Sequence, residues 1–115
     1  MADRSADGPI VVISFRDLES DEDVRTRIDG RCRALRAEFP EANRFEMTLA
    51  PDGAGHIAHV RVSGRNTHLD AVANAIELEL AAERALDRAH GRLRTVHDKR
   101  IFARRRAARK ASAKG

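Results

Sequence analysis

The chain has 115 residues, and its 22 Lys or Arg against 18 Asp or Glu give a formal net charge of +4. This length suits one small domain with a modest core. The single cysteine excludes an internal disulfide and fits a reducing, cytoplasmic compartment. No segment has the pattern of a signal peptide or the roughly 20 apolar residues of a membrane helix, so neither is expected.

The first half of the chain predicts a strand followed by a helix. Residues 1–8 are polar and predict a disordered lead, and the apolar, β-branched run at 10–15 predicts a strand buried on both faces. Ser20 is a suitable N-cap for an amphipathic helix, and Pro40 ends it. The apolar stripe of this helix consists of Val24, Ile28, Cys32, Leu35 and Phe39.

The second half predicts a hairpin and a long helix. Two alternating segments, 44–49 and 56–63, predict half-buried strands that are joined by a turn at 51–55. The spacing Thr67-x-x-Asp70 then resembles a helix-capping pattern and predicts that the second helix starts there.

The predicted order of elements is therefore β-α-β-β-α. A strand–helix–strand step makes the first two strands parallel through a right-handed crossover, and both helices then cover one face of a small mixed sheet. We expect an α/β (α+β) two-layer sandwich over residues 9–100. Residues 101–115 are expected to form a basic tail that is frayed or disordered in isolation.

The charge is divided by position along the chain. Residues 1–87 hold 11 Lys or Arg and 17 acids, a net charge of −6, whereas residues 88–115 hold eleven Lys or Arg and one acid, a net charge of +10. A basic segment on an acidic body indicates a polyanionic partner. Nucleic acid fits better than a membrane surface, because Ile101 and Phe102 are the only bulky apolar pair in the basic run. With four Phe and no Tyr or Trp, contacts to phosphates are expected rather than base stacking.

No residue pattern indicates catalysis or a metal. The five His and the single Cys form neither a C-x-x-C nor an H-x-x-x-H pair. The G-x-S-x-G, P-loop and dinucleotide-binding motifs are missing as well, and Cys32 lies on an apolar stripe where a buried structural role is expected. We therefore expect no enzyme, no cofactor, no metal and no small-molecule substrate.

Several short segments match the pattern of a known family. They are ISFRDL at 13–18, SDEDVRTRI at 20–28, HVRVSG at 59–64, Asp70 with AIE at 75–77, and RLR at 92–94 with HDKR at 97–100. Together they resemble the ribosome hibernation-promoting factor and ribosome-associated inhibitor (sigma-54 modulation protein) family, over roughly residues 10–100. This chain would be a short member. The family has a β-α-β-β-β-α fold, so the elements predicted above are one strand short of it.

The resemblance implies a function and a set of contacts. It implies a factor of the stress response and ribosome hibernation that binds ribosomal RNA on the small ribosomal subunit and sterically blocks the channel of mRNA and transfer RNA. With no counterpart of the long members' dimerisation domain, a monomer or weak dimer is expected. The expected RNA-binding residues are Arg92, Arg94, Lys99, Arg100, Arg27, Arg31 and Arg36, to which the charge of the tail adds Arg104, Arg105 and Arg106.

Other functions stay open at this stage. The chain could be a general nucleic-acid-binding, nucleoid-type protein that uses its basic C-terminal segment, or the segment could serve only for solubility. A third possibility is a protein-interaction module that pairs through an open sheet edge.

Overall fold

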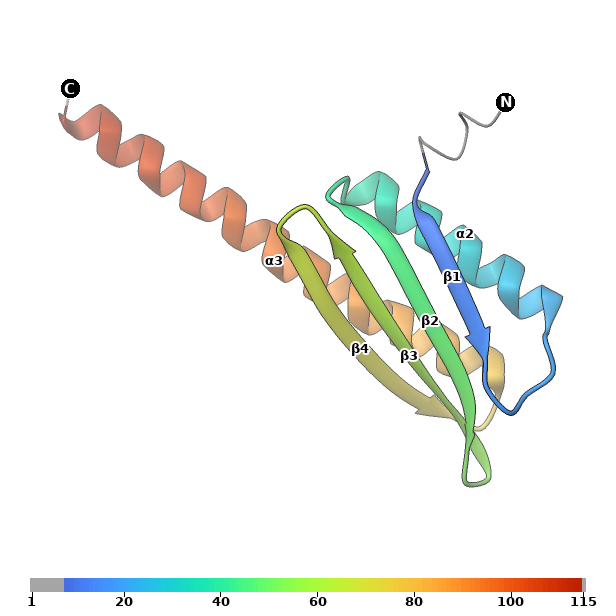
Figure 1. Ribbon diagram of the computed structural model, residues 1–115. Coiled ribbons are helices and arrows are strands. Elements are labelled where there is room, and N and C mark those ends of the chain that lie inside the picture. The colour runs from blue at the N-terminus through green and yellow to red at the C-terminus, as the bar shows by residue number, and fades with distance from the viewer. Residues whose placement is uncertain (1–7, 115) are drawn as a thin grey trace, which may run out of the picture.

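The computed structural model describes residues 8–114, the last seven of them by their backbone alone, and contains one four-stranded sheet with two helices on one of its faces (Figure 1). The elements are β1 (Ile10–Phe15), α2 (Glu22–Glu38), β2 (Ala42–Asp52), β3 (Gly55–Gly64), β4 (Thr67–Ala75) and α3 (Leu78–Lys114). The sheet order is β1-β2-β3-β4, with β1 parallel to β2 and the other pairs antiparallel. The predicted α+β two-layer sandwich is confirmed. The predicted disordered lead lies, except for Gly8, outside the described residues.

The predicted number of strands is wrong by one. Residues 67–75 form β4, which pairs with β3 from Gly64↔Thr67 to His56↔Ala75, and α3 begins only at Leu78. Three of the nine residues of β4 are Ala, which is depleted in strands, and Thr67-x-x-Asp70 imitates a helix cap. Pairing along the whole length of β3 overrides this local preference for a helix.

The first strand is also different from its prediction. We expected a strand buried on both faces, but β1 is an edge strand, and Ile10 and Val12 are 53% and 38% exposed. Only the alternate residues Val11, Ile13 and Phe15 pack against the core. Because the run is apolar on both faces, it shows no alternation of apolar and polar residues. The sequence therefore cannot tell which face of the strand is buried.

The core lies between the sheet and the helices. The apolar stripe predicted on α2 is buried from Val24 to Phe39. Small side chains allow α3 to lie close to β3 and β4, because buried alanines occur on both sides of this contact. They are Ala81, Ala82, Ala85 and Ala89 on the helix and Ala58, Ala71 and Ala73 on the strands.

Two local details differ from the predictions. The N-cap of α2 is Asp21, whose Oδ1 accepts from the backbone N–H of Val24 at 3.1 Å, and not the neighbouring Ser20. The β2–β3 turn contains two residues instead of five, since Asp52 pairs with Gly55 and Gly53 has a φ of 60°.

The segment expected to be irregular is helical, because α3 continues to Lys114. Its 37 residues span about 55 Å, and Figure 1 shows the helix projecting well past the end of the sheet. Ala, Arg and Lys dominate this end and are all strong helix formers. The division into a domain and a tail at residue 101 stays a prediction. No helix within residues 8–114 is long and apolar enough to cross a membrane.

Candidate nucleic-acid interface

A line of ion pairs joins the first halves of α2 and α3. Arg27 contacts Glu79 at 2.8 Å and Glu83 at 3.2 Å, and Arg31 contacts Asp87 at 2.8 Å. The sequence offered no role for Glu79 and Glu83, and the structure supplies one. Two arginines therefore meet three acids, so the predicted RNA-binding residues Arg27 and Arg31 lie in a locally acidic surface.

At the C-terminal end of α2 the two helices exchange roles in the ion pairs. Here the acid belongs to α2, because Glu38 contacts His90 at 3.1 Å and Arg94 at 3.7 Å. The rings of His90 and His97 each lie edge-on to Phe39, with centroids 5.7 Å apart. These contacts attach the middle of α3 to the C-terminal end of α2. Arg94 is thus one member of a weak, exposed pair.

Three arginines on α3 bind the free edge of β4. They are spaced four residues apart, which is about 6 Å along a helix, and alternate residues of a strand are about 6.6 Å apart. Each guanidinium therefore reaches one outward-facing backbone carbonyl. The pairs are Arg84 with Asn74 (3.1 Å), Arg88 with Val72, and Arg92 with Asp70. We call Arg84, Arg88 and Arg92 the arginine ladder.

The arginine ladder has two consequences. It occupies hydrogen-bond acceptors that an added strand would need, so β4 is a poor edge for pairing with another protein. It also gives the predicted RNA-binding residue Arg92 a structural contact. The spacing of the three arginines is visible in the sequence, but its meaning required the position of β4.

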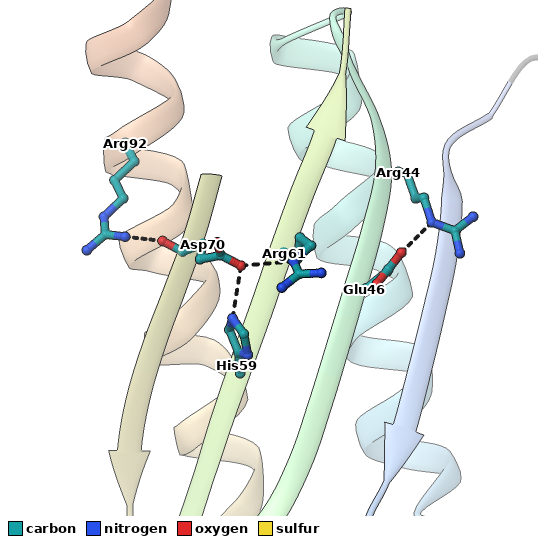
Figure 2. Close-up of polar contacts among 6 residues, drawn as sticks. All are labelled: Arg44, Glu46, His59, Arg61, Asp70 and Arg92. Atoms are coloured by element: carbon teal, nitrogen blue, oxygen red, sulfur yellow. Dashed lines mark hydrogen bonds and ion pairs between the residues drawn. The ribbon is translucent and has the colours of Figure 1, made fainter. Parts of the chain in front are cut away.

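The uncovered face of the sheet carries balanced charges. The carboxylate of Asp70 accepts from His59 Nε2 at 3.0 Å and from Arg61 Nε at 3.2 Å, and Glu46 accepts from Arg44 (Figure 2). The hydrogen bond from His59, and then that from Arg61, lowers the pKa of Asp70. The hydrogen bond from Arg44 lowers the pKa of Glu46. Two acids thus neutralise two arginines, and this face is not suited to a polyanion.

Positive charge without acidic partners is concentrated on α3 from Lys99 to Arg106. Among the side chains that the structure describes, none of the basic residues from 99 to 106 forms an ion pair with an acid. They are Lys99, Arg100, Arg104, Arg105 and Arg106, all named as candidate RNA-binding residues above, and all but Arg100 are exposed. Arg106 lies over the ring of Phe102 at 5.4 Å. The structure therefore brings half of the predicted site residues onto about two successive turns of α3, where they point to different sides of the helix.

A cleft of about 590 Å³ adjoins this surface, and we call it the basic cleft. It lies where the C-terminal end of α2, the start of β2, the β3–β4 turn and α3 meet. Its lining is Arg36, Pro40, Glu41, Asn43, Arg65, Asn66, His97, Arg100, Ile101 and Arg104. Arg36, Arg100 and Arg104 were predicted site residues. Arg65 was missed, because a single arginine in a turn gives no signal in the sequence.

Within the described part of the chain, no group of three or more His, Cys, Asp or Glu is placed to hold a metal ion. Cys32 is buried, and its burial raises the pKa of the thiol to about 12. This placement fits the structural role predicted for Cys32.

Comparisons by sequence find no matching family model and no matching curated protein. Solved structures do match. The crystal structure of the Thermus thermophilus Protein Y N-terminal domain aligns with a TM-score of 0.69 and 18% identity, over 76% of this chain and 98% of that one. The chain has the fold of the Protein Y N-terminal domain. A ribosomal subunit interface protein from Coxiella burnetii aligns with a TM-score of 0.66 and 10% identity, over 76% of this chain and 97% of that one.

These structures confirm, at the level of the fold, the resemblance drawn from the short sequence segments. The strand that the sequence failed to predict, β4, completes the β-α-β-β-β-α order of the family. Among the described side chains, positive charge without an acidic partner is concentrated on α3 from Lys99 to Arg106, at the end of the sheet and beyond it.

Proposed function

We propose that the protein is a cytoplasmic, non-enzymatic factor that binds ribosomal RNA on the small ribosomal subunit. In this proposal it blocks the channel of mRNA and transfer RNA by occupying it, and so silences ribosomes under stress. One observation carries the proposal: a Protein Y fold presents five basic residues without acidic partners on about two turns of α3. The likeness to a ribosomal subunit interface protein supports the choice of the ribosome as the polyanion.

The proposal assigns the contacts unequally among the basic residues. Lys99, Arg104, Arg105 and Arg106 are exposed and have no acidic partner among the described side chains, so they are the main phosphate contacts. Arg36, Arg94 and the less exposed Arg100 add to this group of contacts. Arg27, Arg31 and Arg92 already have protein partners and contribute least.

The direct test is co-sedimentation of the purified protein with small ribosomal subunits at several salt concentrations. The variant Lys99→Glu/Arg105→Glu should lose most of its binding, because each reversed charge replaces an attraction to phosphate with a repulsion. A matched control, Arg16→Glu/Arg33→Glu, makes the same change of charge at exposed arginines outside the proposed surface. Equal loss in both variants, or no binding by the unmodified protein, would refute the proposal.

Blocking of the channel needs its own measurement. Purified protein added to a reconstituted initiation assay should prevent the binding of initiator transfer RNA to the small subunit. The Lys99→Glu/Arg105→Glu variant should be inactive in this assay at the same concentration. Binding to the subunit without inhibition would show that the protein docks outside the channel.

A second candidate is a general nucleic-acid-binding protein of the nucleoid type. The projecting end of α3 favours it, because a basic helix can contact the phosphates of any duplex. Equal affinity for duplex DNA and for small subunits at physiological salt would select this candidate.

A further inference from the structure

The basic cleft has a feature that a solvated basic surface lacks, because four elements of the fold contribute to it. Three of them supply arginines: Arg36 comes from the last turns of α2, Arg65 from the β3–β4 turn, and Arg100 and Arg104 from successive turns of α3. The fourth, the start of β2, supplies Asn43. These four guanidinium groups lie around one depression although they are up to 68 positions apart in the sequence, from Arg36 to Arg104.

The backbone beneath the cleft is held by a chain of hydrogen bonds. The N–H of Arg65 donates to the carbonyl of Glu41 at 3.1 Å. The hydroxyl of Thr67, which is buried, donates to the carbonyl of Arg65 at 3.0 Å and accepts from Arg100 Nη1 at 3.3 Å. The turn that carries Arg65 is thereby linked to α3, so the backbone of Arg65 and the guanidinium of Arg100 are held in place before any ligand arrives.

The charge of the lining favours an anion. Four arginines face one acid, Glu41, so the lining carries a net charge of +3 with His97 neutral. The side chain of Glu41 is only 16% exposed and contacts His97 Nδ1 at 3.4 Å. Glu41 is therefore turned toward α3, and the guanidiniums dominate the field inside the cleft.

The size and the remaining walls indicate a nucleotide rather than an isolated ion. The volume of about 590 Å³ lies within the range of small-molecule pockets, roughly 300–1,000 Å³. Pro40 and Ile101 supply apolar surface against which a base can lie. Asn43 and Asn66 supply amides, which can donate to and accept from the edge of a base.

We propose that the basic cleft binds a single phosphorylated nucleotide, with its phosphate between the arginines and its base against the apolar wall. The recognising chemistry is shared by two sources, a nucleotide within single-stranded RNA and a free nucleotide. Where the source is ribosomal RNA, the proposal rests on the proposed function. It then identifies the basic cleft as the part of the surface that binds one nucleotide.

The test uses the full chain without ribosomes, so its outcome is independent of co-sedimentation. Binding of a fluorescein-labelled pentauridylate is followed by anisotropy for the unmodified protein and two variants. Arg65→Ser should weaken binding by about tenfold or more, the worth of one lost charge-assisted hydrogen bond to phosphate. Arg16→Ser removes the same charge just after β1, whose six residues place it about 20 Å from the end of the sheet at which β2 starts, and it should change affinity by less than about twofold.

Arg36→Ser provides a second variant in case Arg65→Ser perturbs the turn, and thermal unfolding of all three variants shows which are folded. Equal weakening by the cleft variants and by Arg16→Ser would overturn the proposal, since the binding would then be diffuse electrostatic attraction. Unmodified protein that binds small subunits but no oligonucleotide would overturn the cleft proposal and leave the proposed function standing.

Competition with uridine 5′-monophosphate separates the two sources. Displacement of the labelled oligonucleotide at a similar concentration supports a free nucleotide as the ligand. Displacement only by unlabelled pentauridylate supports RNA. Displacement by inorganic phosphate at the same concentration as by the mononucleotide would contradict the role given to the apolar wall and the amides.

Discussion

Replacing Gly64 by Ala should destabilise the protein severely, because this residue allows a close approach between two strand ends. A Cβ at Gly64 would lie 1.8 Å from the carbonyl oxygen of Glu41, whereas Cβ contacts below 3.0 Å essentially never occur. It would also lie 2.9 Å from the backbone nitrogen of Asn43. Both neighbours are backbone atoms, so no side-chain rotation can relieve the overlap.

The size of the effect follows from what must move. To bring the distance from 1.8 Å to 3.0 Å, the carbonyl of Glu41 has to leave the β3–β4 turn, and its hydrogen bond from Arg65 is lost. Losing that bond costs about 1 kcal/mol, and distorting the strand ends costs about 1–3 kcal/mol more. A total of about 2–4 kcal/mol corresponds to a fall in Tm of about 10–25 °C for a domain of this size.

Urea or thermal unfolding followed by circular dichroism measures this change, and the same substitution at Gly30 is the matched control. Gly30 lies in the interior of α2, and a Cβ there would meet nothing within 4 Å. Gly30→Ala should therefore raise the free energy of unfolding by up to about 1 kcal/mol. A Gly64→Ala protein whose stability is within about 0.5 kcal/mol of the unmodified protein would refute the close approach.

Four further predictions concern individual side chains. At about pH 8 the buried thiol of Cys32, with its pKa raised to about 12, should react with iodoacetamide about a thousandfold more slowly than in the urea-unfolded chain, and a fast reaction in the native state would contradict its burial. The lowered pKa of Asp70 means that its carboxylate stabilises the fold above its unfolded pKa of about 3.9 and that this contribution disappears as the pH falls through the folded value. Asp70→Asn should therefore lower the free energy of unfolding by less than about 1 kcal/mol at neutral pH and have no effect in strong acid, and an effect that persists in strong acid would argue against an ionic role. Arg27→Ala should cost less than about 1 kcal/mol in urea unfolding, and about 1 M NaCl should remove the difference; a larger, salt-independent loss would show a packing role. Arg88→Ala should increase self-association in sedimentation velocity, because it frees a carbonyl on the edge of β4, and an unchanged sedimentation coefficient at high concentration would speak against the protective role of the arginine ladder.

The local patterns of the sequence predicted much of the architecture correctly. The apolar spacing from Val24 to Phe39 predicted the buried face of α2, and the alternation around Phe45 and Val60 predicted the hairpin of β2 and β3. Each of these predictions depends on apolar residues that recur every 3.6 or every 2 positions. The first spacing places them on one face of a helix, and the second on one face of a strand.

The errors occurred where local preference and tertiary pairing disagree. Residues 67–75 have the composition of a helix start but become β4, because β3 offers a complete set of backbone partners. The run at 10–15 is apolar on both faces, and only its place at the edge of the sheet leaves Ile10 exposed.

For the candidate site too, the sequence predicted some features, and others could be seen only in the structure. The sequence placed the positive charge from residue 88 onward, and in the structure the basic residues from Lys99 to Arg106 lie on about two turns of α3. It could not show that Arg27 and Arg92 have partners on other elements, nor that Arg65 lines the same cleft as Arg100. Contacts of this kind join residues from 22 to 56 positions apart, and no local pattern records them.

The sequence by itself therefore determined the class of fold, the helical stripe, the hairpin and the division of charge between the two ends of the chain, because these depend on composition and on short periods. Only the tertiary structure decided which arginines carry free charge. Pairing with acids on α3 and with carbonyls on β4 removes some of them, and the meeting of four elements gathers others into the basic cleft. Packing thus divides the basic C-terminal segment: Arg88 and Arg92 belong to the ladder that protects a strand edge, and Lys99 to Arg106 are available to a polyanion.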